Sequence, residues 1–348
     1  MFDELLKSMN TEVSTVSAII KTNNKLRNIL FSRDSLSRQK LEENSEFLEL
    51  SKLVPSERQE WQIYDHCATV TRLYAIYERF VEHLILDWLL LLPELISNYS
   101  DLGDKIQNTH REGVGRLLLD LNKNRFQHLS IEKVVQGLFS GVTGTEQYEL
   151  LPDAFLSHEQ NLRKEILEKL LADAGIENAW KWIDKHRNIK YFVEKISARQ
   201  HTAEGQLKRL VDYRNEAAHR GIFETMSTQE LLDLGDFVKA LCEALAELVS
   251  YQIILRKISI AKAKEIGQIT EWFKKPRAAV ATVTDITLAV GGNIWLVSET
   301  SSYCKLANIE SIQIDDIDKN EVKITSKTEV GLKLDTDAKQ GLSLYVME

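Results

Sequence analysis

The distribution of glycine constrains the fold of this chain more than any other feature. No glycine occurs before Gly103, and residues 1 to about 275 are rich in Leu, Glu, Lys and Ala and poor in Gly and Pro. Such a composition favours helices. From about Ala278 the sequence changes to alternating Val, Ile and Thr, interrupted by turn residues such as Gly291-Gly292-Asn293. This pattern is typical of short strands in hairpins. We therefore predict a mainly α protein, an antiparallel helical bundle followed by a small C-terminal antiparallel β domain.

The change in composition also predicts how the chain is divided. We expect an N-terminal helical segment over 1–55, a helical domain over 56–275 and a β-rich domain over 278–348, because Pro276 would end the preceding helix. Helices are predicted over about 2–30, 56–92, 107–122, 160–173, 177–185, 203–219 and 228–258, with the last able to continue to 273. Strands are predicted at 280–283, 294–297, 312–314, 322–324 and 332–334. The glycine-rich residues 137–144 predict a flexible connection.

Charge and cysteine content narrow the class of protein. The chain has 348 residues and a net charge of −8, which argues against a protein coated in positive charge but leaves room for a local basic groove. Cys67, Cys242 and Cys304 lie far apart and form no Cys-x-x-Cys pair. Neither a disulfide framework nor a thiolate zinc site is therefore predicted, and a reducing cytoplasm is the expected location.

The most apolar run gives no reason to expect a membrane protein. It extends from Leu84 to Leu95, is interrupted by Asp87 and Pro93, and is shorter than the ~20 residues that span a bilayer. The acidic N-terminus has no signal-peptide character. We interpret the run as a buried core helix and predict no membrane partner.

Residues 211–221 carry the candidate chemistry, because an arginine, an amide and a histidine fall at the end of a predicted helix, before Gly221. Asn215 and His219 are four residues apart and share a face. Arg214 and His219 are five apart and diverge by about 140° on a regular helix. They can act together if the long arginine stem swings round, if the last turn relaxes, or if two such helices meet.

These residue types suit cleavage of the RNA backbone without a metal or a cofactor. The ribose 2′-hydroxyl attacks the adjacent phosphorus, and His219 can transfer a proton near neutral pH. Arg214 can hold two oxygens of the pentavalent phosphorane, while Asn215 orients His219 or contacts the backbone. DNA lacks the 2′-hydroxyl and should not be cut. The alternative is an ordinary helix end in which Arg214 pairs with a carboxylate elsewhere.

The surrounding sequence is locally basic. Residues 181–220 hold ten Lys or Arg and five acidic residues, interleaved with the aromatic residues Trp180, Trp182, Tyr191 and Phe192. Such a segment can neutralise phosphates and stack bases, or its aromatic residues can pack in the core beneath a solvated charged face. We expect Lys208, Arg209 and Arg220 to face RNA. The tail after residue 277 has 11 acidic and 6 basic residues, so we expect it to bind protein, either a partner or its own helical domain.

Two segments resemble a known superfamily. Tyr213-Arg214-Asn215, followed by His219 and then Arg220-Gly221, resembles the signature of the HEPN superfamily, whose ribonuclease members carry Arg, a polar residue, and His four to six positions after the Arg. The stretch Arg72 to Val81, which contains Tyr74-Ala75-Ile76-Tyr77-Glu78, resembles the first core helix of RiboL-PSP-HEPN-type proteins. Arg79 stands where that branch often has Gly. The resemblance covers roughly residues 56–258.

The resemblance implies a helical bundle that forms a homodimer, with two copies of the Arg/His motif in one composite cleft across a two-fold interface. It places Glu78 near the site, orienting Arg214 or His219; otherwise Glu78 is an exposed partner for nearby charges. It implies a metal-independent endoribonuclease that acts on RNA as a toxin or antiviral defence effector, with a regulatory protein or antitoxin as a candidate partner. The alternative is a non-catalytic HEPN-like scaffold that binds RNA, nucleotide or protein.

Overall fold

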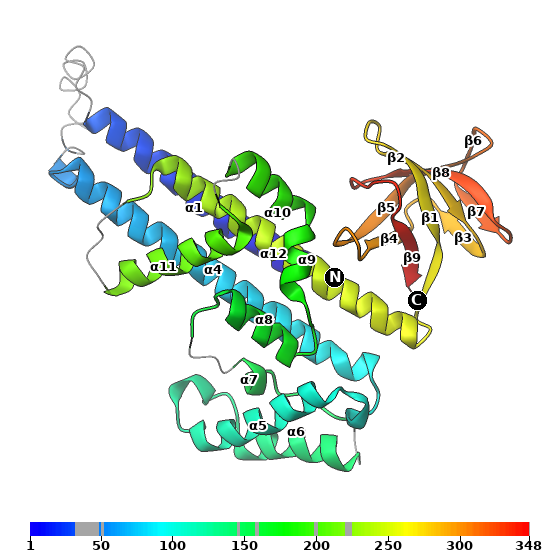
Figure 1. Cartoon of the computed structure of the whole chain (residues 1–348), viewed down its shortest axis with the longest axis horizontal. Coiled ribbons are helices and arrows are strands. Elements are labelled where there is room, and N and C mark those ends of the chain that lie inside the picture. Colours follow the sequence, from blue (N-terminus) through cyan, green and yellow to red (C-terminus); the bar gives the residue numbers. More distant parts are fainter. Residues whose placement is uncertain are drawn as a thin grey trace.

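The computed structural model describes residues 1–31, 49, 52–144, 147–156, 160–197, 201–219 and 225–347. Over this part of the chain a helical region lies beside a β domain (Figure 1). The helices are α1 (Asp3–Leu30), α4 (Arg58–Leu95), α5 (Asp104–Asp120), α6 (Ile131–Thr143), α7 (Pro152–Phe155), α8 (Lys164–Asp173), α9 (Ala179–Lys185), α10 (Arg187–Tyr191), α11 (Ala203–His219) and α12 (Thr228–Ser259), with 3-10 turns at Tyr99–Asp101 and Asn124–Phe126 and a π-helical turn at Phe192–Ile196.

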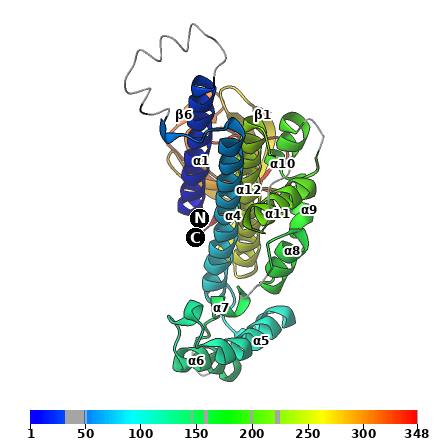
Figure 2. The same ribbon diagram turned by 90° about the vertical axis from the view of Figure 1, so that its left-hand side faces the viewer.

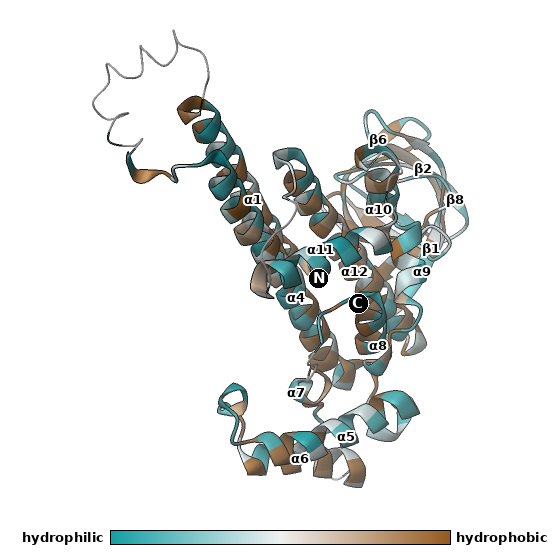
Figure 3. Cartoon of the chain, turned by 60° about the vertical axis from the view of Figure 1, so that its left-hand side comes forward, coloured by the Kyte–Doolittle hydropathy of each residue, from teal (hydrophilic) through white to brown (hydrophobic). Residues whose placement is uncertain are grey.

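Three long helices, α1, α4 and α12, pack against one another and form the centre of the helical region (Figure 2). Their facing sides bury large apolar residues, including Val13 on α1, Leu73 and Trp88 on α4, and Phe237 on α12. Brown and teal segments alternate along α1, as expected of a helix with one buried face (Figure 3). The helix predicted within the N-terminal segment 1–55 therefore shares the core of the following domain.

The sequence predicted most of the long helices. α1, α4, α5, α8, α9, α11 and α12 all lie where the apolar spacing placed them, with ends shifted by a few residues. The run from Leu84 to Leu95 is the buried end of α4, as expected of a core helix. Ser227 and Glu230 form both halves of a capping box at the start of α12. The long helices were predictable because a buried stripe repeated over many turns dominates the local signal.

The flexible connection expected at residues 137–144 was wrong, because most of this stretch belongs to α6. Two of its glycines permit close packing. A Cβ on Gly137 would lie 3.2 Å from Cγ of Leu151, and one on Gly141 would lie 2.8 Å from Cδ2 of Tyr99. Gly144 alone has a left-handed φ of 63°, and it ends the helix.

The β domain contains strands β1 (Ala263–Phe273), β2 (Ala278–Val283), β3 (Ile286–Ala289), β4 (Asn293–Ser298), β5 (Tyr303–Ile314), β6 (Ile317–Lys319), β7 (Glu321–Ile324), β8 (Thr328–Leu334) and β9 (Ser343–Met347). The main sheet has the order β4-β9-β1-β2-β8-β5-β6, with antiparallel pairs, and β4 also pairs with β5. The extra pairing closes the sheet into a barrel, which leaves fewer unpaired strand edges. β3 and β7 form a separate pair.

The predicted boundary at residues 275–278 needs correction, because α12 ends at Ser259 and residues 263–273 form β1. The burial pattern of this strand explains the error. Ala263, Ile266 and Ile269 are buried at a spacing of three, which resembles a helix, because register shifts interrupt the pairing of β1 with both of its neighbours. The β domain therefore begins before Pro276, and the region from Phe273 to Ala278 joins β1 to β2.

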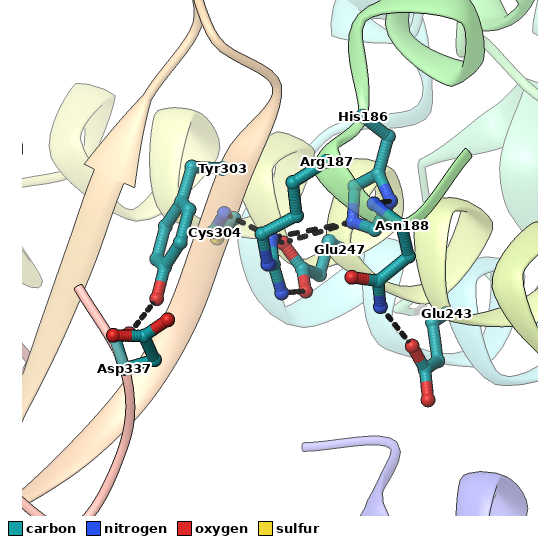
Figure 4. A network of polar contacts seen from close by, with 8 residues as sticks. All are labelled: His186, Arg187, Asn188, Glu243, Glu247, Tyr303, Cys304 and Asp337. Atoms are coloured by element: carbon teal, nitrogen blue, oxygen red, sulfur yellow. Dashed lines mark hydrogen bonds and ion pairs between the residues drawn. The ribbon is translucent and has the colours of Figure 1, made fainter. Parts of the chain in front are cut away.

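A buried carboxylate joins the helical region to the barrel (Figure 4). Glu247 of α12 is 6% exposed and accepts hydrogen bonds from both terminal nitrogens of Arg187, and its Oε2 accepts from the backbone N–H of Cys304 on β5 at 3.1 Å. The Arg187 guanidinium also lies 4.3 Å from the ring centroid of Tyr303. Burial would raise the pKa of Glu247, but the hydrogen bonds from Arg187 and His186 outweigh it and lower the pKa to about 2.

Two glycines on α5 provide a matched test of the packing. A Cβ on Gly113 would lie 2.1 Å from the carbonyl oxygen of Ala154, whereas one on Gly115 would meet nothing within 4 Å. We expect Gly113→Ala to lower the free energy of unfolding by about 1–3 kcal/mol. Gly115→Ala should raise it by roughly 0.5–1 kcal/mol, because alanine favours the helix. Chemical denaturation measures both, and equal effects would contradict the packing described.

The pH dependence of stability tests the Glu247 junction. Because the folded-state pKa lies near 2 and the ordinary value is 4.5, the stabilisation is complete above both values and is lost as the pH falls from about 4.5 towards 2. The full effect is on the order of 3 kcal/mol. Denaturant titrations between pH 7 and pH 3 should show that the free energy of unfolding falls more steeply in the wild type than in Glu247→Gln. The exposed Glu321→Gln is the control and should behave like the wild type. An equal pH dependence in the wild type and in Glu247→Gln would show that Glu247 does not stabilise the junction in this way.

Candidate functional site

The motif helix α11 packs across α4 and is held there by an apolar face. Leu207, Leu210 and Val211 are fully buried, and the side chains from Asp212 to Ala217 are half-buried along the edge of the contact. The next helical turn therefore carries Arg214 and Asn215 to the border between the core and solvent. The position follows from ordinary amphipathic spacing, which places polar side chains beside the buried stripe.

Arg214 lies over an aromatic ring and has no acidic partner among the residues that the structure describes. Its guanidinium carbon is 5.1 Å from the ring centroid of Tyr74 on α4. One terminal nitrogen donates to Oδ1 of Asn215 at 3.2 Å. Among the described residues no carboxylate lies within ion-pair distance of it, so the alternative of a structural ion pair finds no support. The remaining N–H groups can therefore bind an anion.

Tyr74 connects Arg214 to Glu78. Its hydroxyl donates to Oε1 of Glu78 at 2.8 Å and accepts from the backbone N–H of Leu162 at 3.0 Å. Burial and then the neighbouring Glu78 raise the pKa of Tyr74 above its usual value, although Leu162 and Arg214 oppose this. The phenol therefore stays protonated at neutral pH and continues to donate. Tyr74 thus contacts both Arg214 and Glu78, and Asn215 joins this cluster through its hydrogen bond with Arg214.

A segment before α8 completes the cluster. The side-chain amide of Asn161 donates to Oδ1 of Asn215 at 2.9 Å, so this oxygen accepts from both Asn161 and Arg214. Two residues further on, Arg163 pairs with Asp212 of the motif helix at 2.7 Å. Sequence reasoning missed Asn161 because its partner is 54 residues away and no local pattern marks it. Tyr74 stood in the resemblance segment, but nothing local indicated its contact with Arg214.

His66 on α4 contacts the chain on both sides of the motif. Its ring meets that of Tyr213 edge to face at 5.0 Å, and its Nδ1 accepts from the backbone N–H of Met226 at 3.1 Å. Burial lowers the pKa of His66, with Glu230 opposing, so the ring is held neutral. A neutral His66 ring can accept a hydrogen bond through Nδ1. Its contacts with Tyr213 and Met226 help to position the motif and the chain that follows it.

The remaining predicted site residues are exposed, are bound to other side chains, or lie outside the described residues. His219 is the last residue of α11, but its side chain lies outside the described residues, as does all of Arg220. Lys208 is exposed and its ammonium lies 3.4 Å from Asp212. Arg209 is bound by Glu230 at 3.2 Å and by Nε2 of His201 at 3.0 Å. Lys208 therefore faces solvent, while Arg209 joins α11 to the start of α12.

The aromatic residues of the basic segment mostly pack in the core. Trp180, Trp182 and Phe192 are each at most 5% exposed, as the core-packing alternative predicted, while Tyr191 is 61% exposed. In the described ranges no three His, Cys, Asp or Glu side chains gather as metal ligands. Within the same ranges, no helix combines the length and the apolar character needed to cross a bilayer.

The packed helices and the Arg-Asn-x-x-x-His helix end define a HEPN-type helical domain. The family model described as RiboL-PSP-HEPN matches residues 34–251, and the chain belongs to this family. Comparison with curated proteins and with solved structures gives no match. The family match ends within α12, so the β barrel lies beyond it.

Removal of one hydroxyl tests the cluster. Tyr74→Phe keeps the ring beneath Arg214 but leaves the buried N–H of Leu162 without its acceptor and Glu78 without its donor. We expect the free energy of unfolding to fall by about 1–3 kcal/mol. Tyr64 lies on the same helix and is 71% exposed, so Tyr64→Phe should change stability by less than about 0.5 kcal/mol. Equal losses in chemical denaturation would show that the Tyr74 hydroxyl makes no special contribution.

Proposed function

We propose that this protein is a metal-independent endoribonuclease that cleaves RNA by attack of the ribose 2′-hydroxyl. The observation that carries the proposal is the state of Arg214, which has no carboxylate partner among the described residues and lies over Tyr74 beside Asn215. A cation held by an aromatic face and an amide retains donors for a phosphate. Membership of the RiboL-PSP-HEPN family supports an activity on RNA.

In the proposed reaction His219 transfers the proton and Arg214 stabilises the phosphorane. The imidazole removes the proton of the 2′-hydroxyl, or protonates the departing 5′-oxygen, since its usual pKa is close to neutral. The new bond joins the 2′-oxygen to phosphorus, and the bond to the 5′-oxygen breaks. The products are a 2′,3′-cyclic phosphate and a 5′-hydroxyl. Glu78 keeps the Tyr74 hydroxyl oriented and thereby positions the ring under Arg214.

We propose that two copies of the chain form the complete site. Arg214 and His219 are five residues apart on α11, so they diverge by about 140° around the helix axis. A second copy across a two-fold axis would supply the complementary group to each half. Lys208 would attract the RNA backbone, Arg220 would extend this contact, and Arg209 would add positive potential while holding α11 to α12.

RNA cleavage in EDTA tests the chemistry. Arg214→Ala should lower the cleavage rate by roughly 10²–10³-fold and His219→Ala by roughly 10²–10⁴-fold. Arg111→Ala is the matched control, since Arg111 hydrogen-bonds only to Asn108 on α5 among the described residues. Fragment ends should be cyclic phosphates, and DNA of the same sequence should stay intact. Loss of cleavage in EDTA, or full activity of His219→Ala, would refute this mechanism.

Mixed dimers test the composite cleft. Coexpressed Arg214→Ala and His219→Ala chains should regain part of the activity if the two groups act from opposite subunits, whereas a site within one subunit would stay inactive.

Growth arrest on expression of the wild type, absent for both variants, is the expected sign of the proposed toxin or antiviral role. If RNA binds but neither the wild type nor any mixture cleaves it, the protein is the non-catalytic RNA-binding scaffold instead.

A further inference from the structure

The end of α10 presents an aromatic ring and a lysine to solvent. Ile189 and Phe192 are three residues apart and are both buried, so the two residues between them, Lys190 and Tyr191, face outwards. Tyr191 is 61% exposed. Lys190 forms no ion pair or hydrogen bond with any residue that the structure describes, including Glu194 one turn further on. The exposed ring and the unpaired cation are therefore both available to a ligand.

The barrel brings a second lysine to the same place. Lys339 lies in the connection between β8 and β9, is exposed, and has no ion-pair partner over the described ranges. Desolvation, and then the positive charges of Lys190 and Arg187, lower the pKa of Lys339 below its ordinary value. The charge of Arg187 is balanced by Glu247. The two lysines, one from each domain, thus lie within electrostatic reach of each other without a carboxylate to balance them.

The backbone that carries Lys339 is held against the helical region. Leu342, three residues further on, is fully buried in the barrel. The hydroxyl of Tyr303 donates to the backbone carbonyl of Asp337, and the Arg187 guanidinium lies 4.3 Å from the Tyr303 ring centroid (Figure 4). Because these contacts fix the connection beside α10, the two lysines repel each other at a fixed junction. An anion bound between them would remove this repulsion.

The chemistry of a single-stranded nucleic acid fits this surface. Each of its repeats supplies a phosphate for the lysines and a flat base that can stack on an exposed ring, whereas an acidic peptide supplies the charge alone. The surface also lies on a useful side of the molecule. Figure 2 shows α10 and α11 on the same side of the long helices α4 and α12, so a strand held at Arg214 on α11 can continue towards α10.

We propose that Lys190, Tyr191 and Lys339 form a second contact surface for single-stranded RNA, built jointly by α10 and the barrel. The two ammonium groups bind backbone phosphates, and the Tyr191 ring stacks on an unpaired base. The barrel thereby takes part in RNA binding, although it lies outside the family match. The surface extends the proposed action on RNA but does not require cleavage. A wild-type protein that binds RNA here and cuts none would refute the nuclease and leave this surface standing.

Fluorescence anisotropy with a 2′-O-methyl oligouridylate tests the proposal on the full-length protein, because the blocked 2′-hydroxyl prevents cleavage of the probe. In Lys190→Ala/Lys339→Ala the affinity should fall, and the slope of log affinity against log salt concentration should become shallower by about 1.4, since each phosphate contact of a single strand contributes about 0.7. Lys319→Ala/Lys323→Ala removes the same charge from exposed positions of the barrel and should leave the slope unchanged. Equal slopes in the two double variants, or a wild type that does not bind the probe, would overturn the surface.

Tyr191→Ala tests the ring separately from the charges. The affinity for the same probe should fall roughly 5–100-fold through loss of stacking, with an unchanged salt slope. Phe139 on α6 is 57% exposed, and Phe139→Ala is the matched control that should bind like the wild type. Because Tyr191 is exposed, the melting temperature should stay at the wild-type value. Unchanged affinity in Tyr191→Ala would contradict the stacking, and displacement of the probe by polyglutamate as effective as by unlabelled oligouridylate would show that the surface binds acidic protein segments instead.

Discussion

The packing of α4 against both α1 and α12 is the interaction on which the rest of this structure depends. α4 buries an almost continuous apolar stripe from Val70 to Leu95, which includes the fully buried Trp88. Each buried side chain of this size contributes roughly 1.5–3 kcal/mol. This buried stripe fixes how α4 is rotated about its own axis and how far it is shifted along its neighbours. Every polar group on its remaining faces therefore has a defined position against its neighbours.

These polar groups explain how a structural helix also supports the candidate site. Asp65 forms a buried ion pair with Arg27 of α1, and Glu12 of α1 pairs with both Arg72 and Arg79. Arg79 stands where RiboL-PSP-HEPN-type proteins often have Gly, and in this chain it pairs with Glu12. Along the side that faces α11, Tyr74 contacts Arg214. The same rigid helix therefore holds α1 through ion pairs and the motif through an aromatic ring.

The limits of sequence reasoning follow from the range of each interaction. α1, α4 and α12 were predictable because their apolar spacing is maintained over many turns, and Arg214 and Asn215 were proposed as site residues from their chemical type alone. Strand β1 was missed because irregular pairing breaks the alternation of buried residues, and α6 was missed because its glycines serve close packing. The contact of Asn161 with Asn215 exists only in three dimensions, so no periodicity or spacing in the sequence could indicate it.

The segment from Asn161 to Arg187 connects the motif to the junction with the barrel. At its start the Asn161 amide donates to Oδ1 of Asn215, and at its end Arg187 donates to Glu247, which also accepts from the backbone of β5. Between them, α8 packs against both α9 and α11, and α9 and α10 pack against α12. The position of the motif amide and the position of the barrel therefore both depend on how this one segment packs against its neighbours. The same long helix, α12, carries Glu247 and contacts α11, so the two contacts share a common support.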